Sequence, residues 1–258
     1  MAVIEVSQTG AVARVRLQRP EVHNAFNPEM IAALRVAFKD IDEASDVRLA
    51  ILSGEGKSFC GGADINWMRA SLDLDYQANL KDAEEMSGMF RRIDRCSKPV
   101  IAQIQGAALG GGSGLAACCD IVVAGEEAVF GFTETRLGIL PAVISPFVLA
   151  KIGAGNARRY FFTGERFDAR RAQAIGLVHD IVESAGLQAR VEAIAADLLS
   201  AGPTAVMRSK QLIREVLATA YDDTLTLTAE VIAVQRTSPE GQEGLRAFLE
   251  RRKPSWAL

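Results

Sequence analysis

The stretch that decides the fold reads Lys98-Pro-Val-Ile-Ala-Gln-Ile-Gln-Gly-Ala-Ala-Leu-Gly-Gly-Gly-Ser-Gly-Leu-Ala116. An apolar strand at Val100–Ile104 runs into a glycine cluster, after which we expect a helix to begin at once. This order aims bare backbone N–H groups at one point and adds the positive end of a helix dipole. Because glycines let a ligand atom approach the backbone closely, the expected guest is an oxygen that carries or acquires negative charge.

A second glycine-rich turn, Phe59-Cys-Gly-Gly-Ala-Asp-Ile65, has the same form, since it follows the buried strand Leu49–Leu52 and opens a helix. Alone, it could be an ordinary strand-to-helix turn in which the glycines only supply positive φ angles. The functional interpretation is that it presents the N–H of Ala63. Two such turns favour this interpretation, because an oxyanion hole needs two convergent donors.

The composition is that of an ordinary globular protein. The chain has 258 residues, of which 49% are hydrophobic and 24% charged, enough for one large domain or one domain with an appendage. The net charge of −3 and the absence of a basic block argue against a nucleic-acid partner. No apolar run approaches the ~18 residues that cross a bilayer, so no membrane partner is expected.

The cysteines and the N-terminus predict a reduced, cytoplasmic protein. Four cysteines lack the spacing of a disulfide framework: Cys60, Cys96, Cys118 and Cys119. The first residues lack the basic start and apolar core of a signal peptide. With two histidines and no Cys-x-x-Cys pair, a zinc site is not expected.

Strand, loop and helix alternate through about residue 130, which predicts an α/β core with crossover connections. The predicted strands cover residues 3–6, 12–18, 49–52, 99–104, 121–124 and 128–130. Asn27 and Pro28 suit the start of a helix, and a long helical region is predicted at about 66–95. The buried face of the first helix is expected at Ile31, Leu34, Phe38 and Ile41.

After about residue 143 the pattern becomes helical. Short helical segments are predicted at 144–152, 155–162 and 168–175, and longer ones at 187–200, 203–219, 222–237 and 239–252. We therefore predict a core at residues 1–200 and a C-terminal helical region at residues 201–258. Helices in such an appendage often pack on a partner subunit, so an oligomer is expected.

The sequence comes close to common nucleotide-binding and hydrolase motifs, but each match is broken at one required position. The dinucleotide pattern G-x-G-x-x-G requires glycine where Leu115 stands, and Leu115 also breaks the G-x-S-x-G elbow around Ser113. A P-loop ending at Gly56-Lys-Ser58 would require glycine at Ile51. These mismatches argue against a dehydrogenase, a serine hydrolase and an NTPase.

The chain resembles the enoyl-CoA hydratase/isomerase (crotonase) superfamily along nearly its whole length. The resemblance is carried by the two glycine-rich turns, Asn24-Ala25, Cys119-Asp120, Phe130 to Pro141, and the ending Ala247 to Pro254. It implies an α/β fold, a spiral of ββα units with a C-terminal α-helical trimerisation region, assembled as a homotrimer or a dimer of trimers. It also implies an acyl-CoA substrate, no metal, and no cofactor beyond the coenzyme A of that substrate.

The resemblance also assigns residues of the site. The N–H groups of Ala63 and Gly111 would form the oxyanion hole for the thioester oxygen, and Glu134 would be the catalytic carboxylate. The residues expected to contact coenzyme A are Cys60, Gly61, Asp64, Ile65 and Gly110. Asn66 stands where the family often has a lysine.

Glu134 has two interpretations. It could be a solvated surface carboxylate, which is the usual fate of glutamate. Its apolar flanks, Phe130, Phe132 and Leu137, instead favour a desolvated side chain with a raised pKa, which can act as a base.

The chain departs from the family at Gly114, where typical hydratases carry the first of two glutamates. One carboxylate suffices to move a proton between two carbons, so mechanism alone favours a Δ3-Δ2 enoyl-CoA isomerase. The segment Leu140-Pro-Ala-Val-Ile-Ser-Pro-Phe-Val148 instead resembles a subgroup that also tends to lack that glutamate. That subgroup hydrates methylglutaconyl-CoA and related branched enoyl-CoAs. The predicted function is therefore hydration of the 2,3 double bond of a short or branched enoyl-CoA.

Two further hypotheses come from other classes of protein. The chain could be a catalytically weak acyl-CoA binding protein that lost its chemistry together with the first glutamate. An RNA-binding module is opposed by the acidic balance of the chain. A glutaconyl-type substrate would need a basic partner for its second carboxylate, for which Arg69 and Arg136 are candidates.

Overall fold

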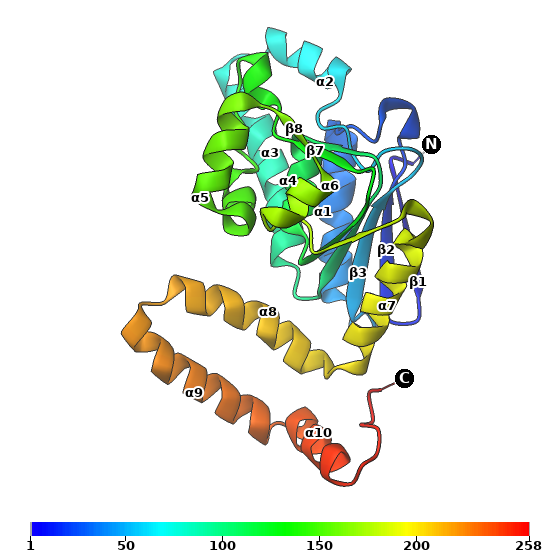
Figure 1. Ribbon diagram of the computed structural model, residues 1–258. Helices are drawn as coiled ribbons and strands as arrows, with labels where there is room; N and C mark the ends of the chain where they lie inside the picture. Colours follow the sequence, from blue (N-terminus) through cyan, green and yellow to red (C-terminus); the bar gives the residue numbers. More distant parts are fainter. Residues whose placement is uncertain (1, 258) are drawn as a thin grey trace.

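The computed structural model describes residues 2–257, so the end residues of the two predicted regions, Met1 and Leu258, lie outside it. A six-stranded sheet has the order β1-β2-β3-β4-β6-β9, and a three-stranded sheet has the order β5-β7-β8. The strands are β1 (Ile4–Thr9), β2 (Val12–Leu17), β3 (Leu49–Gly54), β4 (Val100–Ile104), β5 (Ala107–Leu109), β6 (Ile121–Gly125), β7 (Val129–Gly131), β8 (Arg166–Asp168) and β9 (Asp180–Val182). The α/β prediction is confirmed (Figure 1).

Ten α-helices surround and extend these sheets. They are α1 (Pro28–Glu43), α2 (Ile65–Ala70), α3 (Tyr76–Arg95), α4 (Gly111–Cys118), α5 (Ser145–Thr163), α6 (Ala169–Ala174), α7 (Leu187–Ser200), α8 (Pro203–Ala218), α9 (Tyr221–Thr237) and α10 (Pro239–Leu249). Short 3-10 helices are η1 (Pro20–Val22), η2 (Ser71–Asp73), η3 (Glu134–Leu137) and η4 (Ser184–Gly186). None of the helices within residues 2–257 is long and apolar enough to cross a bilayer.

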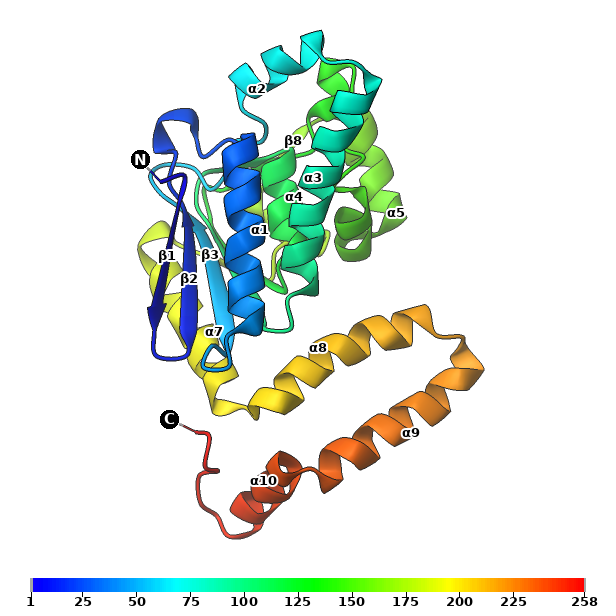
Figure 2. The ribbon, with the colours of Figure 1, turned by 180° about the vertical axis from the view of Figure 1, so that it is seen from behind.

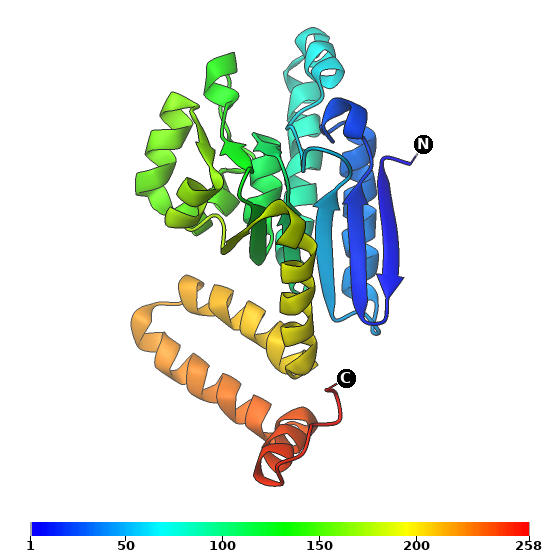
Figure 3. The ribbon, with the colours of Figure 1, turned by 45° about the vertical axis from the view of Figure 1, so that its right-hand side comes forward.

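The large sheet separates two apolar layers. Alternate strand residues such as Val15, Leu52 and Ala102 join the main core with α1, α3, α4 and α5 (Figure 2). The intervening residues, among them Ile51 and Ile101, pack against α7 on the other face (Figure 3). This alternation follows from the period of two in a strand, and it leaves the ends of the strands free to carry loops.

The first helix forms as its sequence predicts. The Asn27 side chain accepts a hydrogen bond from the N–H of Met30, and Pro28 occupies the first turn. The buried face comprises the predicted Ile31, Leu34, Phe38 and Ile41. This helix lies beside α3 and anchors the loop that carries Phe26 to the site.

Both glycine-rich turns leave the sheet at the same edge. The strands β2, β3, β4, β6 and β9 run parallel, whereas β1 pairs antiparallel with β2. Since β3 and β4 are parallel neighbours, the chain segments that follow their carboxyl ends emerge side by side. Ligand sites in parallel sheets form at this edge.

Three local predictions were wrong. The strand at Val100–Ile104 does not run directly into the glycine cluster, because β5 lies between β4 and that cluster; the helix α4 does begin there, at Gly111. The region predicted as one helix at 66–95 is α2, η2 and α3, since Asp75 caps a new helix by accepting from the N–H of Ala78. Strand β8 falls inside the part predicted as helical, where it pairs antiparallel with β7.

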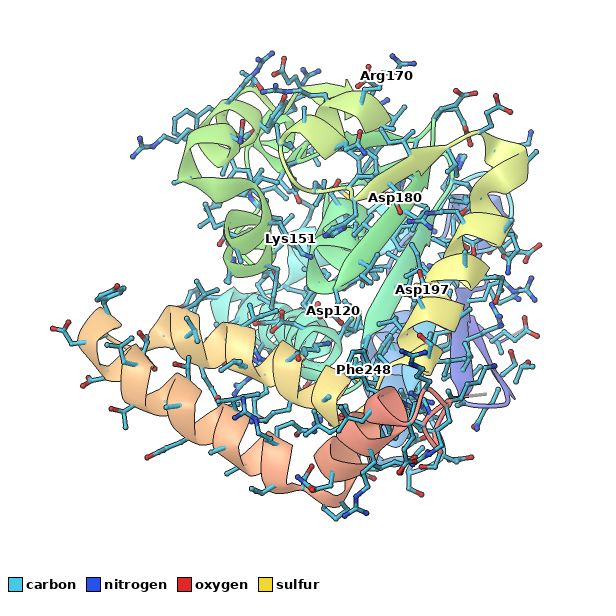
Figure 4. The ribbon with its side chains drawn as sticks, turned by 60° about the horizontal axis from the view of Figure 1, so that its bottom comes forward. Asp120, Lys151, Arg170, Asp180, Asp197 and Phe248 are labelled. Carbon is cyan, nitrogen blue, oxygen red and sulfur yellow. The ribbon has the colours of Figure 1, made fainter. Side chains whose placement is uncertain are left out.

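The last three helices leave the core as an arm (Figures 1 and 3). Helix α8 contacts the core through a 2.6 Å ion pair between Lys210 and Asp120 and a hydrogen bond from Arg214 to the carbonyl of Asp94. Lys151 of α5 donates to the Asp120 carbonyl beside this contact (Figure 4). Helices α8 and α9 contain no buried residue, which leaves their apolar side chains accessible. The division at residue 200 remains a prediction.

Candidate active site

The two glycine-rich turns pair with each other through their backbones. The N–H of Cys60 donates to the carbonyl of Ala107 at 3.0 Å, and the N–H of Leu109 donates to the carbonyl of Cys60 at 3.0 Å. A side chain at Gly112 would overlap the Cys60 carbonyl. The glycine at position 112 is therefore required for this pairing of the two turns.

The backbone groups on either side of Ala63 form hydrogen bonds with Phe26, whereas the N–H of Ala63 itself does not. The N–H of Phe26 donates to the Gly62 carbonyl at 2.7 Å, and the N–H of Asp64 donates to the Phe26 carbonyl at 2.8 Å. A Cβ placed on Gly62 would lie 3.9 Å from the Gly111 nitrogen, so the turns converge here. Within residues 2–257, neither the Ala63 nor the Gly111 N–H donates to another protein group.

A cavity of about 200 Å³ lies next to these two N–H groups. Its walls come from the two turns, from η3 with the segment after it, and from α2 and α3. The lining residues are Phe26, Gly61, Gly62, Ala63, Met68, Met86, Gly110, Gly111, Thr133, Glu134, Leu137, Ile139, Leu140, Pro141, Ala142, Val143 and Ile144. Apart from Glu134, no lining side chain carries a charge.

A larger cavity of about 660 Å³ meets the first one at Gly61 and Ala63, which line both. It is lined by Glu21, Val22, His23, Ala25, Ser58, Gly61, Ala63, Asp64, Ile65, Asn66, Ala107, Leu109 and Arg166. The available N–H of Ala63 therefore lies where the two cavities meet. A ligand that spans them has one end in each and its middle at the two N–H groups.

Glu134 is a carboxylate in an apolar surround. It begins η3, and a Cβ placed on Gly110 would lie only 3.2 Å from its Oε1 atom. Its Oε2 atom is buried and has no hydrogen-bond partner in the described part of the chain. Burial raises the pKa of Glu134 above the ordinary glutamate value. A carboxylate without a cation beside it is suited to accept and return a proton.

Asp64 holds the first turn in place. Its carboxylate accepts from the N–H groups of Asn66 and Trp67 at the start of α2, and it pairs with Arg19 at 2.8 Å. Arg19 also donates to the Ala25 carbonyl. Burial opposes the charged form, but these hydrogen bonds outweigh it and lower the pKa of Asp64. This carboxylate therefore fixes the backbone on both sides of the turn.

The structure separates the residues expected to contact coenzyme A. Gly61, Asp64 and Ile65 line the larger cavity, and Gly110 lines the smaller one. Cys60 lines neither cavity, because its side chain is fully buried behind the turn and its backbone pairs with the other turn. A direct contact of the Cys60 side chain with a ligand is therefore not supported.

Sequence reasoning missed two side chains of the site. Phe26 lies against Gly111, where a Cβ would come within 2.8 Å of the Phe26 ring. Ile144 covers Gly114 in the same way, with its Cβ 2.9 Å from the position of an added Cβ. The signal in the sequence was that Gly111 and Gly114 have no side chains, which lets neighbouring side chains pack against their backbone. The sequence does not indicate which residues do so.

Both the sequence and the fold of this chain are similar to those of known proteins. The family profile described as "Enoyl-CoA hydratase/isomerase" matches residues 7–257. The crotonyl-CoA hydratase of Syntrophomonas wolfei is 34% identical over 95% of this chain and 94% of that protein. The short-chain-enoyl-CoA hydratase of Clostridium acetobutylicum is 34% identical over 96% and 95%.

Solved structures share the whole arrangement. The crystal structure of an enoyl-CoA hydratase from Shewanella pealeana superposes with a TM-score of 0.94 at 39% identity, covering 98% of this chain and 96% of that one. The arm and both sheets therefore belong to one fold that the two proteins have in common.

Proposed function

This chain belongs to the enoyl-CoA hydratase/isomerase family, and on that premise we propose that it adds water across the 2,3 double bond of a short enoyl-CoA thioester. The observation that carries the proposal is the meeting of two available N–H groups, Ala63 and Gly111, beside the half-buried side chain of Glu134, whose Oε2 atom is buried. The larger cavity would take coenzyme A, and the smaller one the acyl group.

Hydration would proceed through an enolate. Glu134 accepts a proton from water as the water oxygen bonds to C3, and the π electrons move to the thioester oxygen. The N–H groups of Ala63 and Gly111 stabilise that oxygen, each by about 2.7–4 kcal/mol in a comparable hole. Glu134 then gives its proton to C2, which yields the 3-hydroxyacyl thioester and restores the carboxylate.

The test is turnover of crotonyl-CoA followed by mass spectrometry. The proposal expects a product heavier by one water, and a steady-state rate that depends on enzyme concentration. A 3-enoyl-CoA thioester is incubated in parallel. If its double bond moves to the 2-position and no water is added to either substrate, hydration is overturned in favour of isomerisation. Tight binding of every thioester without turnover would instead support an acyl-CoA binding protein.

One observation favours the isomerase as the second candidate. The position of the first family glutamate is Gly114, and the side chain of Ile144 fills the space beside it. Among residues 2–257, Glu134 is then the only charged residue that lines the smaller cavity. An isomerase needs no second carboxylate, since Glu134 would take a proton from C2 of a 3-enoyl thioester and return it to C4.

The acyl group that fits this cavity is short and uncharged. A methylglutaconyl substrate carries a second carboxylate, which requires a basic partner when it is desolvated. Neither Arg69 nor Arg136 lines the cavity, and Arg136 donates to the Thr163 carbonyl instead. We therefore propose an unbranched or branched hydrocarbon chain, and the methylglutaconyl substrate stays a prediction that the lining of this cavity does not favour.

We further propose a homotrimer or a dimer of trimers built through α8–α10. The support is the apolar surface of this arm, where Leu217 is 82% and Phe248 81% exposed in the single chain. The cytoplasmic location remains a prediction, and cell fractionation would test it.

A further inference from the structure

The start of helix α4 carries a row of glycines, without side chains, that faces the smaller cavity. Gly114 follows Gly111 by three residues and the N-cap residue Gly110 by four, so it lies on the same face of the helix start as these two glycines. Gly110 and Gly111 line the cavity, whereas Gly114 does not. Something therefore covers the row at its far end.

Ile144 is that cover. An added Cβ on Gly114 would overlap the Ile144 Cγ2 atom and lie 2.9 Å from its Cβ. The Ile144 side chain is 3% exposed and also lines the cavity, so one side faces Gly114 and the other faces the space for the acyl group. Ile144 thus forms the wall between that space and the second turn of α4.

The wall is fixed in position. The carbonyl of Ile144 accepts from the N–H groups of Phe147 and Val148 at the start of α5. Behind it, Phe90 approaches Gly114 and packs edge-on against Phe26 at 6.0 Å between ring centroids. A β-branched side chain that is 3% exposed and sits at a helix start cannot swing aside without disturbing the core.

Given the proposed function, we infer that Ile144 sets the upper size of the acyl group that the enzyme accepts. Ile144 is the lining residue that separates the cavity from Gly114, so an acyl chain that extends towards the second turn of α4 meets its side chain. Replacing Ile144 by alanine removes three carbon atoms from this wall and lets the cavity extend over Gly114. One methylene group in an apolar pocket changes specificity by about 10–200-fold.

Binding of saturated acyl-CoA thioesters tests this inference without requiring turnover. Calorimetry would compare acetyl-, butanoyl-, hexanoyl- and octanoyl-CoA on wild type, on Ile144→Ala and on Ile152→Ala. Ile152 is a matched control, because it is a buried isoleucine of α5 that does not line the cavity. We expect Ile144→Ala to bind octanoyl-CoA at least about 10-fold more tightly than wild type, and Ile152→Ala to keep the wild-type order.

Two results would overturn the inference, and they are distinguishable. An unchanged preference for chain length in a folded Ile144→Ala protein removes the size limit but leaves the proposed function intact. Failure of the wild type to bind any of the thioesters removes both. If the alanine variant does not fold, Ile144→Val tests the same wall with one methyl group fewer, and Ile144→Phe must weaken butanoyl-CoA binding.

Discussion

The Oε2 atom of Glu134 is buried and has no hydrogen-bond partner within residues 2–257, which is a costly state for an ionised carboxylate. Replacing Glu134 by glutamine keeps the shape and removes the proton acceptor, so we expect turnover to fall by about 100- to 10,000-fold. Steady-state kinetics on crotonyl-CoA measures this. Glu165→Gln is the control, since Glu165 pairs with Arg159 outside both cavities. Equal loss in both variants would contradict the catalytic role.

The raised pKa of Glu134 also predicts how stability depends on pH. Because burial penalises the ionised form, the folded protein holds this proton to a higher pH than the unfolded chain does. Stability is therefore fully present below the unfolded pKa and is partly lost as pH rises through the folded pKa. Glu134→Gln should lack this loss, so it should be at least as stable as wild type near neutral pH. Denaturant unfolding across pH would show this, and a variant less stable than wild type at neutral pH would contradict it.

Gly114 and Ile144 should be coupled in stability. Gly114→Ala forces a methyl group into the Ile144 side chain and should destabilise the protein by about 1–3 kcal/mol. In an Ile144→Ala background the same change should cost less, because the overlapping Cγ2 atom is gone and the close contact that stays is the one with the Cβ atom at 2.9 Å. Urea unfolding of the two single variants and the double variant measures the coupling.

Gly155→Ala is the control for this cycle. No atom lies within 4 Å of a Cβ placed on Gly155 in α5, so alanine there should be neutral or mildly stabilising. Additive effects of Gly114→Ala and Ile144→Ala would show that the two side-chain positions do not compete for space.

At the scale of elements, the turn before α2 depends on the ion pair between Arg19 and Asp64. Arg19→Met leaves a buried carboxylate without its cation, which should cost about 3–5 kcal/mol and loosen the Ala63 N–H. Arg16→Met breaks pairs with Glu5 and Glu55 that are largely exposed, so it should cost about 1 kcal/mol or less. Thermal unfolding and kcat are measured on both variants. Equal losses of stability and of kcat in Arg19→Met and Arg16→Met would contradict a special role of the buried pair.

Elements with strong local signals were predictable from the sequence. Helix α1 has a cap, a proline in its first turn and one apolar face, so its start at Pro28 and its buried residues are confirmed. Strand β5 was not predictable, because three residues gain their strand character only by pairing with β7. The break before α3 had a signal in Asp75, whose side chain caps the new helix, and the prediction of one helical region at 66–95 missed it.

In the site, the backbone donors were predictable from the sequence, whereas the packing of side chains around them was not. The glycine-rich turns indicate two backbone donors, since few other sequences bring bare N–H groups to the end of a strand. The position of Ile144 over Gly114 was not predictable, because the two residues are 30 positions apart in the sequence and meet only when α5 packs on α4. Packing partners of this kind require coordinates.

At the scale of the molecule, the arm exposes large apolar side chains, among them Leu217 and Phe248, as surfaces that pack on a partner do. We expect the protein to have the mass of three or six chains, and Leu217→Glu with Phe248→Glu to reduce it. Light scattering after size-exclusion chromatography measures the mass. Val36→Glu, at an exposed apolar residue of α1, is the control and should leave the assembly unchanged. A monomeric wild type would contradict this assignment of the arm.

The burial of Cys60 has a consequence for the lifetime of the enzyme. A 2-enoyl thioester is an electrophile, and a cysteine thiolate can add to its C3 atom and remain attached. Cys60 belongs to the turn that would hold such a molecule, yet burial raises the pKa of its thiol to about 12. The sulfur stays protonated behind the backbone, which protects the protein from alkylation by the compound that it is proposed to convert.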